Sequence, residues 1–239
     1  VLLEQLRREG FEMTVGPPRV LYREDENGKR LEPMEEAQID VDDEYSGVVV
    51  EKMGLRKGEM TEMRPSGGGK TRIVFDIPSR GLIGYQGEFL ADTRGTGILS
   101  RLFKGFAPHK GPIPGRREGV LISAEQGTAA PYALTNLEGR GALFVDPGDP
   151  VYVGMIIGEH NKGNDLEVNP IKAKQLTNFR ASGKEDTVKL TPPIRRTLEE
   201  ALAYIQDDER VEVTPESIRL RKAIMDPNER KKDKRRRES

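Results

Sequence analysis

Residues 33–110 carry the pattern that most restricts what this chain can fold into, because strand-like and helix-like segments follow one another in a fixed order. The expected elements are a strand at 37–42, a helix at 43–58, strands at 58–65 and 70–78, a helix at 82–95 and a strand at 98–109. Apolar alternation indicates the strands and glycines end both helices, although the run at 48–50, Val-Val-Val, weakens the first helix. This βαββαβ order predicts a ferredoxin-like domain.

From Gly111 on, short β-like segments separated by many Gly and Pro residues replace this pattern. Strands are expected within 118–127, 129–137, 141–148 and 151–160, and a strand pair within 211–222. The main helix is expected at 198–209, where Thr197 can cap the first turn and apolar residues from Leu198 to Ile205 share one face. The predicted fold class is therefore α+β, a ferredoxin-like domain followed by a mostly β domain with one main helix.

Both ends of the chain are expected to lie outside these two domains. Residues 2–9 have the pattern of an amphipathic helix, and 11–24 that of a strand broken by two prolines. Because Val1 falls inside a helical pattern, we expect a fragment whose first part is the remnant of a preceding domain. The expected division is a remnant at 1–32, domains at 33–110 and 111–225, and a basic mobile tail at 226–239 that is too charged to bury anything.

Residue types exclude several kinds of site. The chain has no Cys, which excludes a disulfide scaffold, a thiolate nucleophile and a Cys-ligated metal. Its two histidines, His109 and His160, lack metal-site spacing, so no metal is expected, and no catalytic constellation is visible. The run SGGGKT at 66–71 is similar to a phosphate loop, but Arg64 stands where that motif needs its first Gly. A glycine-rich hairpin turn is the predicted structure.

No apolar run approaches the roughly 20 residues that span a bilayer, and no signal peptide opens the chain. We therefore expect a cytoplasmic protein without a membrane partner. Its net charge of -1, from 39 bases and 40 acids, conceals segregation along the chain. Residues 160–198 hold eight bases and four acids, residues 199–216 one base and seven acids, and residues 219–239 ten bases and four acids. Basic blocks of this kind favour nucleic acid as a partner.

The basic segment 160–196 also holds amides and small residues, and a long polar segment in a compact domain is usually functional or disordered. We predict that it contacts RNA: lysines neutralise phosphates, an arginine clamps a phosphate, and amides bond base edges or 2′-hydroxyls. Phe179 could stack on a base or pack in the core. The predicted RNA contacts are His160, Lys162, Asn164, Asn169, Lys172, Lys174, Asn178, Arg180, Arg195 and Arg196. Two alternatives stay open: a merely solubilising loop, or a protein-interaction module that uses the acidic helix 197–209.

Several long stretches resemble one known family. IPSRGLIGYQGEFLADTRGTGIL (77–99) is similar to the signature of domain V in the TypA/BipA family of bacterial translational GTPases, which is related to elongation factor G. LLEQLRREGFEMTVGPPRV (2–20) resembles the end of that family's domain III. The stretches at 119–134, 151–183 and 192–222 resemble the C-terminal domain that other translational GTPases lack. The resemblance covers nearly the whole chain, from about Leu2 to Lys222.

This resemblance implies a ribosome-binding role. The family's GTPase domain, its domain II and most of its domain III would be absent, so neither enzymatic activity nor a cofactor is expected for this chain. The longer protein would use GTP and a magnesium ion. The resemblance also implies large-subunit rRNA and the acceptor arm of A-site tRNA as partners, and a part in stress or cold adaptation and in large-subunit assembly.

Overall fold

The computed structural model describes residues 1–116, 118–173 and 190–238. Contacts between Cα atoms divide the chain into two compact units. Unit 1 consists of residues 1–17 and 116–239, and unit 2 of residues 18–115. The segment expected as a remnant, 1–32, is thus shared between the units.

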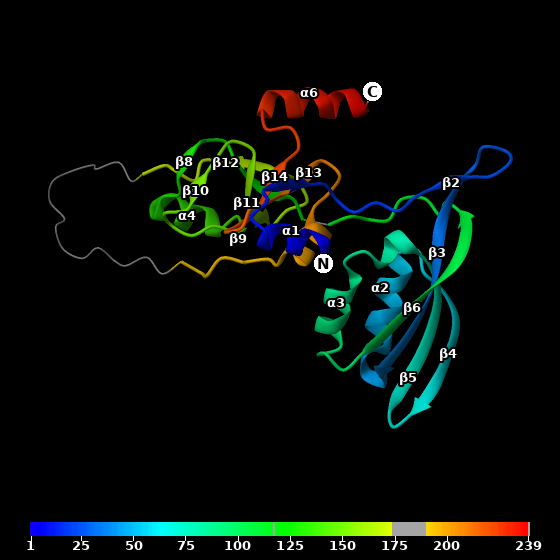
Figure 1. The fold of residues 1–239 in the computed structure, drawn as a ribbon. Coiled ribbons are helices and arrows are strands. Elements are labelled where there is room, and N and C mark those ends of the chain that lie inside the picture. Colours follow the sequence, from blue (N-terminus) through cyan, green and yellow to red (C-terminus); the bar gives the residue numbers. More distant parts are fainter. Residues whose placement is uncertain (117, 174–189, 239) are drawn as a thin grey trace, which may run out of the picture. The chain divides into compact units, whose positions relative to one another are not determined.

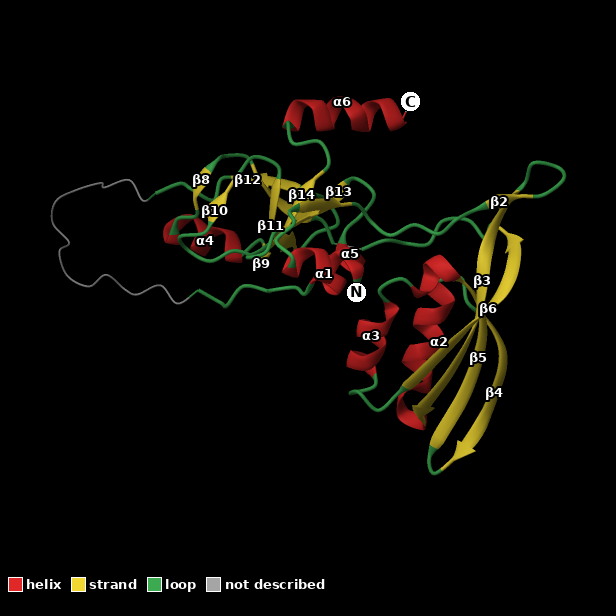
Figure 2. Ribbon diagram, viewed as in Figure 1, coloured by secondary structure: helices red, strands yellow, loops and turns green. Residues whose placement is uncertain are grey.

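Unit 2 has the βαββαβ order and ferredoxin-like architecture expected from the sequence (Figures 1 and 2). Its central strand β3 pairs antiparallel with β5 and β6, and β4 pairs with β5 at one edge. Its elements are β2 (Arg23–Glu24), β3 (Arg30–Asp42), the 3-10 turn η1 (Asp43–Tyr45), α2 (Ser46–Leu55), β4 (Glu59–Gly67), β5 (Lys70–Pro78), the 3-10 turn η2 (Ser79–Leu82), α3 (Tyr85–Asp92) and β6 (Ile98–Pro108).

The glycine-rich run of unit 2 is a hairpin turn, as predicted. β4 ends at Gly67 and β5 begins at Lys70, so only Gly68 and Gly69 lie between the strands. Both have positive φ angles, 64° and 75°. Two-residue hairpin turns of this type need positive φ at both central residues, which glycine adopts without steric cost.

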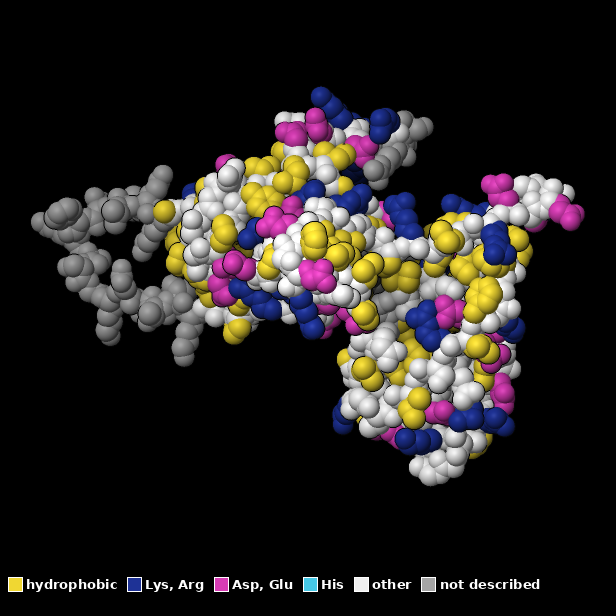
Figure 3. All heavy atoms as spheres, viewed as in Figure 1, with side chains coloured by type: hydrophobic (Ala, Val, Ile, Leu, Met, Phe, Trp, Pro, Cys, Tyr) yellow, Lys and Arg dark blue, Asp and Glu magenta, His cyan; other side chains and the backbone are white. Residues whose placement is uncertain are grey.

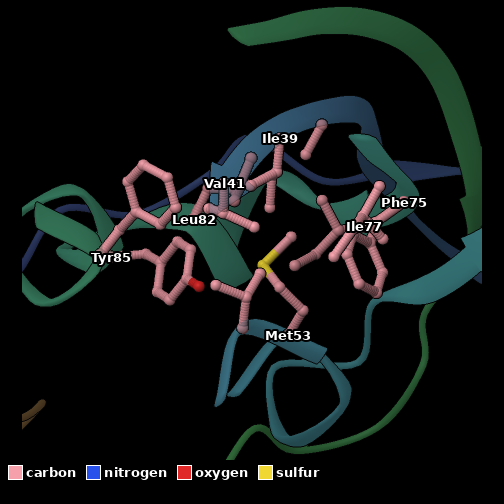
Figure 4. Close-up of a cluster of buried hydrophobic side chains, with 11 residues drawn as sticks. Ile39, Val41, Met53, Phe75, Ile77, Leu82 and Tyr85 are labelled. Carbon is pink, nitrogen blue, oxygen red and sulfur yellow. The ribbon is translucent and has the colours of Figure 1, made fainter. Parts of the chain in front are cut away.

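The core of unit 2 lies between one face of its sheet and the helices α2 and α3 (Figure 4). Ile39 of β3 and Phe75 of β5 are buried there with Met53 of α2 and Tyr85 of α3. Along β3, every second residue from 37 to 41 is buried, which is the pattern of a strand with one covered face. The helices therefore fix which side chains of the sheet face the core.

The opposite face of this sheet is polar and carries ion pairs. Arg72 Nε donates to Asp40 Oδ1 at 2.7 Å, and Lys104 Nζ donates to Asp76 Oδ2 at 2.6 Å. Asp40, Arg72 and Asp76 alternate in sequence with buried residues, so β3 and β5 each have a buried face and a solvent-exposed face.

Unit 1 is built on a seven-stranded sheet with the order β1-β13-β14-β11-β7-β12, and β9 also pairs with β11. A separate two-stranded sheet pairs β8 with β10. The elements are α1 (Leu2–Arg8), β1 (Met13–Val15), β7 (Val120–Ser123), β8 (Gly127–Thr128), α4 (Pro131–Glu138), β9 (Gly141–Leu143), β10 (Pro150–Val151), β11 (Met155–His160), β12 (Leu166–Val168), α5 (Leu198–Tyr204), β13 (Glu209–Val213), β14 (Ile218–Lys222) and α6 (Pro227–Glu238).

Both faces of the large sheet in unit 1 are covered at β7 and β11. Val120 and Ile156 lie in one apolar cluster with Ala201 of α5, whereas Leu121 and Ile157 lie in another with Leu134 of α4. Adjacent residues of one strand thus belong to two cores, because side chains alternate across a strand. The cluster that contains α5 also receives Leu3 of α1 and Met13 of β1, so the first residues of the chain complete unit 1.

Some sequence predictions differ from this structure. The main helix, expected at 198–209, is shorter: α5 ends at Tyr204, and Glu209 begins β13. The segment 129–137, expected as a strand, forms helix α4. Pro131 occupies the first helical turn, where its missing N–H is not needed, and Ala133, Leu134 and Leu137 are buried on one face. The prediction of a strand was wrong because Tyr, Thr and Leu in a short apolar run do not by themselves distinguish strand from helix.

The tail was predicted to be a mobile arm, and the structure describes residues 227–238 as helix α6. The carboxylate of Asp226 accepts hydrogen bonds from the N–H groups of Asn228 and Glu229, at 2.8 and 2.9 Å, and so caps the helix. Arg230 joins α6 to the sheet by an ion pair of 2.8 Å with Glu167. Local capping thus gives this charged segment regular structure.

Candidate nucleic-acid interface

The turn 160–164 lies at the end of β11 and is fixed by hydrogen bonds from His160 and Gly119. His160 is 5% exposed, and its Nδ1 lies 2.5 Å from the carbonyl oxygen of Asn164, to which it donates. The N–H of Gly119 donates to the carbonyl of Lys162 at 2.7 Å. A Cβ atom at residue 119 would lie 2.1 Å from the carbonyl oxygen of Asn164, so only glycine permits this close approach. The buried imidazole therefore shapes the turn, and we remove it from the proposed RNA contacts.

Lys162 lies at the exposed tip of this turn, next to Arg140 at the end of α4. Together with Asn161 and Asn164 these residues line a hollow of about 380 Å³. Neither cation has a carboxylate partner within the part of the chain that the structure describes. Arg140 was not among the predicted contacts, and the signal that could have suggested it is its position directly after the helix-ending Gly139.

The predicted amide contacts make local hydrogen bonds. Asn169 Oδ1 accepts from the N–H of Ile171 at 3.0 Å, and Asn164 Nδ2 donates to the carbonyl of Asp165 at 3.2 Å. Both side chains are exposed, and these bonds fix their orientation. Lys172, three residues after Asn169, is exposed and has no ion pair with any of the described residues.

The two predicted arginines differ in environment. Arg195 is 60% exposed and is bound by Asp146 and Asp149, at 2.6 and 3.2 Å. Arg196 stacks on two rings, with its guanidinium carbon 4.1 Å from the ring centroid of Phe144 and 3.9 Å from that of Tyr204. Burial lowers the pKa of Arg196 from its usual value. Arg196 therefore belongs to the packing around α5, and we remove it too from the proposed contacts.

The remaining predicted contacts, Lys174, Asn178 and Arg180, lie outside the described residues, as does Phe179. Of the ten predicted residues, the structure thus places Lys162 and Asn164 together on one turn, and Asn169 and Lys172 together beyond β12. Arg195 lies apart from both pairs, in an acidic setting.

The acidic residues around α5 have internal partners. Thr197 and Glu200 form a capping box, in which each side chain accepts a hydrogen bond from the backbone N–H of the other residue. Glu209 is fully buried and is bound by Arg116 at 2.8 Å and by Lys222 at 3.0 Å. Burial alone would raise the pKa of this carboxyl group, but the two cations lower it. Asp208 also binds Lys222, at 3.0 Å.

A metal centre finds no support in the described ranges, where no three His, Asp or Glu residues are grouped so that they could hold an ion. Among the same residues, no helix has the length and apolar character required to cross a membrane. The exposed cations and amides of unit 1 can bind phosphates and base edges.

Comparison with known proteins gives consistent matches over most of the chain. Residues 118–227 match the TypA/BipA C-terminal domain, and residues 29–117 match the elongation factor G C-terminus. Over 233 residues, 97% of this chain, the sequence is 51% identical to the large ribosomal subunit assembly factor BipA of Bacillus subtilis. It is 50% identical to the protein of that name from Haemophilus influenzae and 48% identical to that from Escherichia coli K12. The chain spans 38% of the length of these relatives. With an elongation factor G C-terminus followed by a TypA/BipA C-terminal domain, the chain belongs to the TypA/BipA family.

Proposed function

We propose that this chain is the ribosome-binding part of a TypA/BipA-type translational GTPase and that it binds large-subunit rRNA. The observation that carries the proposal is the identity of about 50% over 97% of the chain to proteins named large ribosomal subunit assembly factor. A binding surface, unlike a fold, depends on individual exposed residues, so the geometry of unit 1 is the second support.

Exposed cations without carboxylate partners among the described residues supply that support. Lys162 and Arg140 flank one hollow, and Lys172 lies beyond the other end of β12. Helix α6 adds further bases, of which Lys231, Lys232 and Arg235 are exposed. Each uncompensated cation can neutralise a phosphate and release a counterion, which is the main sequence-independent contribution to RNA binding.

The finer parts of the proposal follow from the family. The longer protein would bind and hydrolyse GTP with a magnesium ion outside this chain, would act in the cytoplasm and would meet A-site tRNA as well as rRNA. A role in stress or cold adaptation belongs to the same expectation. Because the chain lacks a phosphate-loop motif, we expect calorimetric titration with GTP and magnesium ion to give no stoichiometric binding.

The competing hypothesis is that an acidic helix recruits a basic protein, but several of the carboxylates in this region already have partners within the unit. Glu200 caps α5, and Asp208 and Glu209 bind Lys222. Carboxylates that are bound within the unit are not available to a partner. Glu199 and Glu216 are exposed and provide the natural control positions.

The deciding experiment is co-sedimentation of the whole chain with purified large subunits at several salt concentrations. The double variant Lys162→Ala/Lys172→Ala should bind more weakly and should reduce the slope of log K against log salt by roughly 0.7–0.9 per lost contact. Glu199→Ala/Glu216→Ala is the matched control and should bind at least as well as the native chain. The reverse ranking would contradict the RNA proposal and favour the protein partner. Removal of residues 231–239 should weaken RNA binding without changing the melting temperature.

A further inference from the structure

Strand β6 of unit 2 carries an aromatic side chain that the fold does not use. Phe103 is 60% exposed and lies outside the buried cluster of unit 2, although the chain has only seven Phe residues and no Trp. A large apolar ring at this exposure contributes little to folding, because it stays largely in water. The question is what this ring could bind.

A bulge places a second ring beside it. Phe103 lies opposite Glu35 and Phe106 opposite Pro33, so three steps along β6 correspond to two along β3. Strict alternation would send residues 103 and 106 to opposite faces of the sheet. The extra residue returns both to one face, where their ring centroids are 5.8 Å apart in an edge-to-face arrangement.

An arginine completes this group. Arg23 of β2 lies over Phe106, with its guanidinium carbon 4.1 Å from the ring centroid. Arg23 is exposed and has no carboxylate partner among residues that the structure describes. A guanidinium stacked on a ring still presents its N–H donors at the edge, where they can meet a phosphate. The space-filling view shows hydrophobic side chains next to Lys and Arg side chains over this end of unit 2 (Figure 3).

We propose that Arg23, Phe103 and Phe106 form an RNA-stacking site on unit 2, which takes an unpaired nucleobase on Phe103 and the adjoining phosphate on Arg23. The proposal rests on the proposed RNA-binding function and adds a site on a unit for which no RNA contact was predicted. Exposed aromatic rings beside free cations are the means by which proteins bind single-stranded nucleic acid, since every base has a stacking face.

Charge distinguishes RNA from an apolar protein partner at this site. Nearby Arg101 is bound by Glu35 at 2.7 Å, whereas the charge of Arg23 is not compensated in this way. The exposed Leu102 lies opposite Glu36, on the reverse face of the strand. An apolar partner would use only the ring of Phe103, whereas a nucleotide uses both the ring and the cation of Arg23.

The first test uses the absence of tryptophan. Phe103→Trp gives the whole chain a single tryptophan at the site, which can be excited selectively over the six tyrosines, and Leu102→Trp gives a control on the opposite face of the same strand. The probe is a single-stranded oligouridine of ten nucleotides. Base stacking should quench the fluorescence of the Phe103→Trp variant and leave that of the Leu102→Trp variant nearly unchanged. Equal quenching of both, or of neither, would overturn the site.

The second test compares affinities for the same labelled oligonucleotide. Phe103→Ala should weaken binding about fivefold to a hundredfold, the effect expected for loss of one stacked base, and Phe103→Tyr should restore it. Arg23→Ala should also weaken binding. Arg30→Ala is its matched control. The guanidinium carbon of Arg30 also lies 4.1 Å from a ring centroid, that of Tyr22, but Arg30 pairs with Glu24, one position along β2 from Arg23. An unchanged melting temperature would show that the variants fold.

The outcomes separate this site from the general function. If the native chain binds RNA and Phe103→Ala binds equally well, the stacking site is wrong and the proposed function stands. If the native chain binds neither the oligonucleotide nor large subunits, the proposed function fails and the site with it. If Phe103→Leu binds large subunits as the native chain does while Phe103→Ala does not, the ring meets an apolar protein surface and the RNA site is overturned.

Discussion

The two larger sheets of this molecule bury their apolar side chains in different ways. In unit 2 one face of the sheet is covered by α2 and α3, and the other face bears ion pairs such as Lys104–Asp76. In unit 1 the sheet has an apolar cluster on each face, and all four residues of β7 are buried. A strand with one covered face alternates in burial, whereas a strand covered on both faces is continuously apolar. The difference therefore appears in the sequence as the spacing of the buried residues, which is every second residue from 37 to 41 in β3 and every residue in β7.

The charges follow the same division. Unit 1 buries a complete carboxylate, Glu209, between Arg116 and Lys222. Unit 2 places most of its pairs on the open face, although the buried Glu32, bound by Arg80, is an exception. A charged residue that is fully buried, as Glu209 is, must find its partners inside the protein.

The largest expected effect is that of breaking the buried pair of unit 1. Glu209→Ala leaves Arg116 and Lys222 without their central carboxylate, and should lower the free energy of unfolding of unit 1 by about 3–5 kcal/mol. Hydrogen exchange followed by mass spectrometry resolves the two units. Asp76→Ala, which removes an exposed pair of unit 2, is the control and should change protection little. Equal losses of hydrogen-exchange protection in the two variants would contradict the difference between the buried pair and the exposed pair.

Neighbouring residues on one strand test the difference in burial directly. Ile156→Ala and Ile157→Ala in β11 should each cost about 2–5 kcal/mol, because both side chains are buried, on opposite faces. In β5, Phe75→Ala should cost about 3–5 kcal/mol, but Val74→Ala on the open face only about 1 kcal/mol or less. Urea unfolding measures the free energy of unfolding of all four variants. A large loss for Val74→Ala would mean that the open face is covered.

Acid should destabilise both units through their buried carboxylates. Burial opposes ionisation, but the cations around Glu209 and Glu32 lower the pKa of each below its ordinary value of 4.5. The resulting stability is fully present above the unfolded pKa and is lost as the pH falls through the folded pKa. The loss is about 1.4 kcal/mol for every tenfold difference between the acid constants of the folded and unfolded states. Urea midpoints between pH 7 and pH 3 measure it. Glu209→Gln should remove its contribution in unit 1 and leave that of unit 2 intact.

The smallest effect concerns the helix that covers one face of unit 1. Thr197→Ala removes the capping box of α5 and should lower the free energy of unfolding by about 1 kcal/mol. Thr197→Ser keeps the hydroxyl group and should restore most of it. A thermal melt of the two variants against the native chain is sufficient. If the Ser variant were as unstable as the Ala variant, the cap would not be the source of the effect.

Local patterns predicted the elements whose signals are strong and self-contained. The βαββαβ order, the turn at Gly68-Gly69 and the capped helix after Thr197 are confirmed, because each depends on residues close together in the chain. The strand predicted at 129–137 is helix α4 instead, because a run this short fits either period and the neighbouring sheet decides.

The candidate site was less predictable. Sequence indicated a basic, amide-rich segment, and Lys162 and Lys172 are exposed as that requires. It could not indicate that His160 would be buried under its turn or that Arg196 would pack against both Phe144 and Tyr204. Residue type states what a side chain can bind, whereas burial decides whether a ligand can reach it.

The sequence alone therefore determined the family, the order of elements in unit 2 and the segregation of charge, since all three are written in contiguous residues. Only the tertiary structure decided that residues 1–17 complete unit 1, where Met13 of β1 pairs with Val213 of β13. It also decided that a bulge in β6 brings Phe103 and Phe106 to one face. Both facts depend on strand pairing between residues far apart in the chain, and pairing register is set by the packing of whole sheets, which local sequence does not encode.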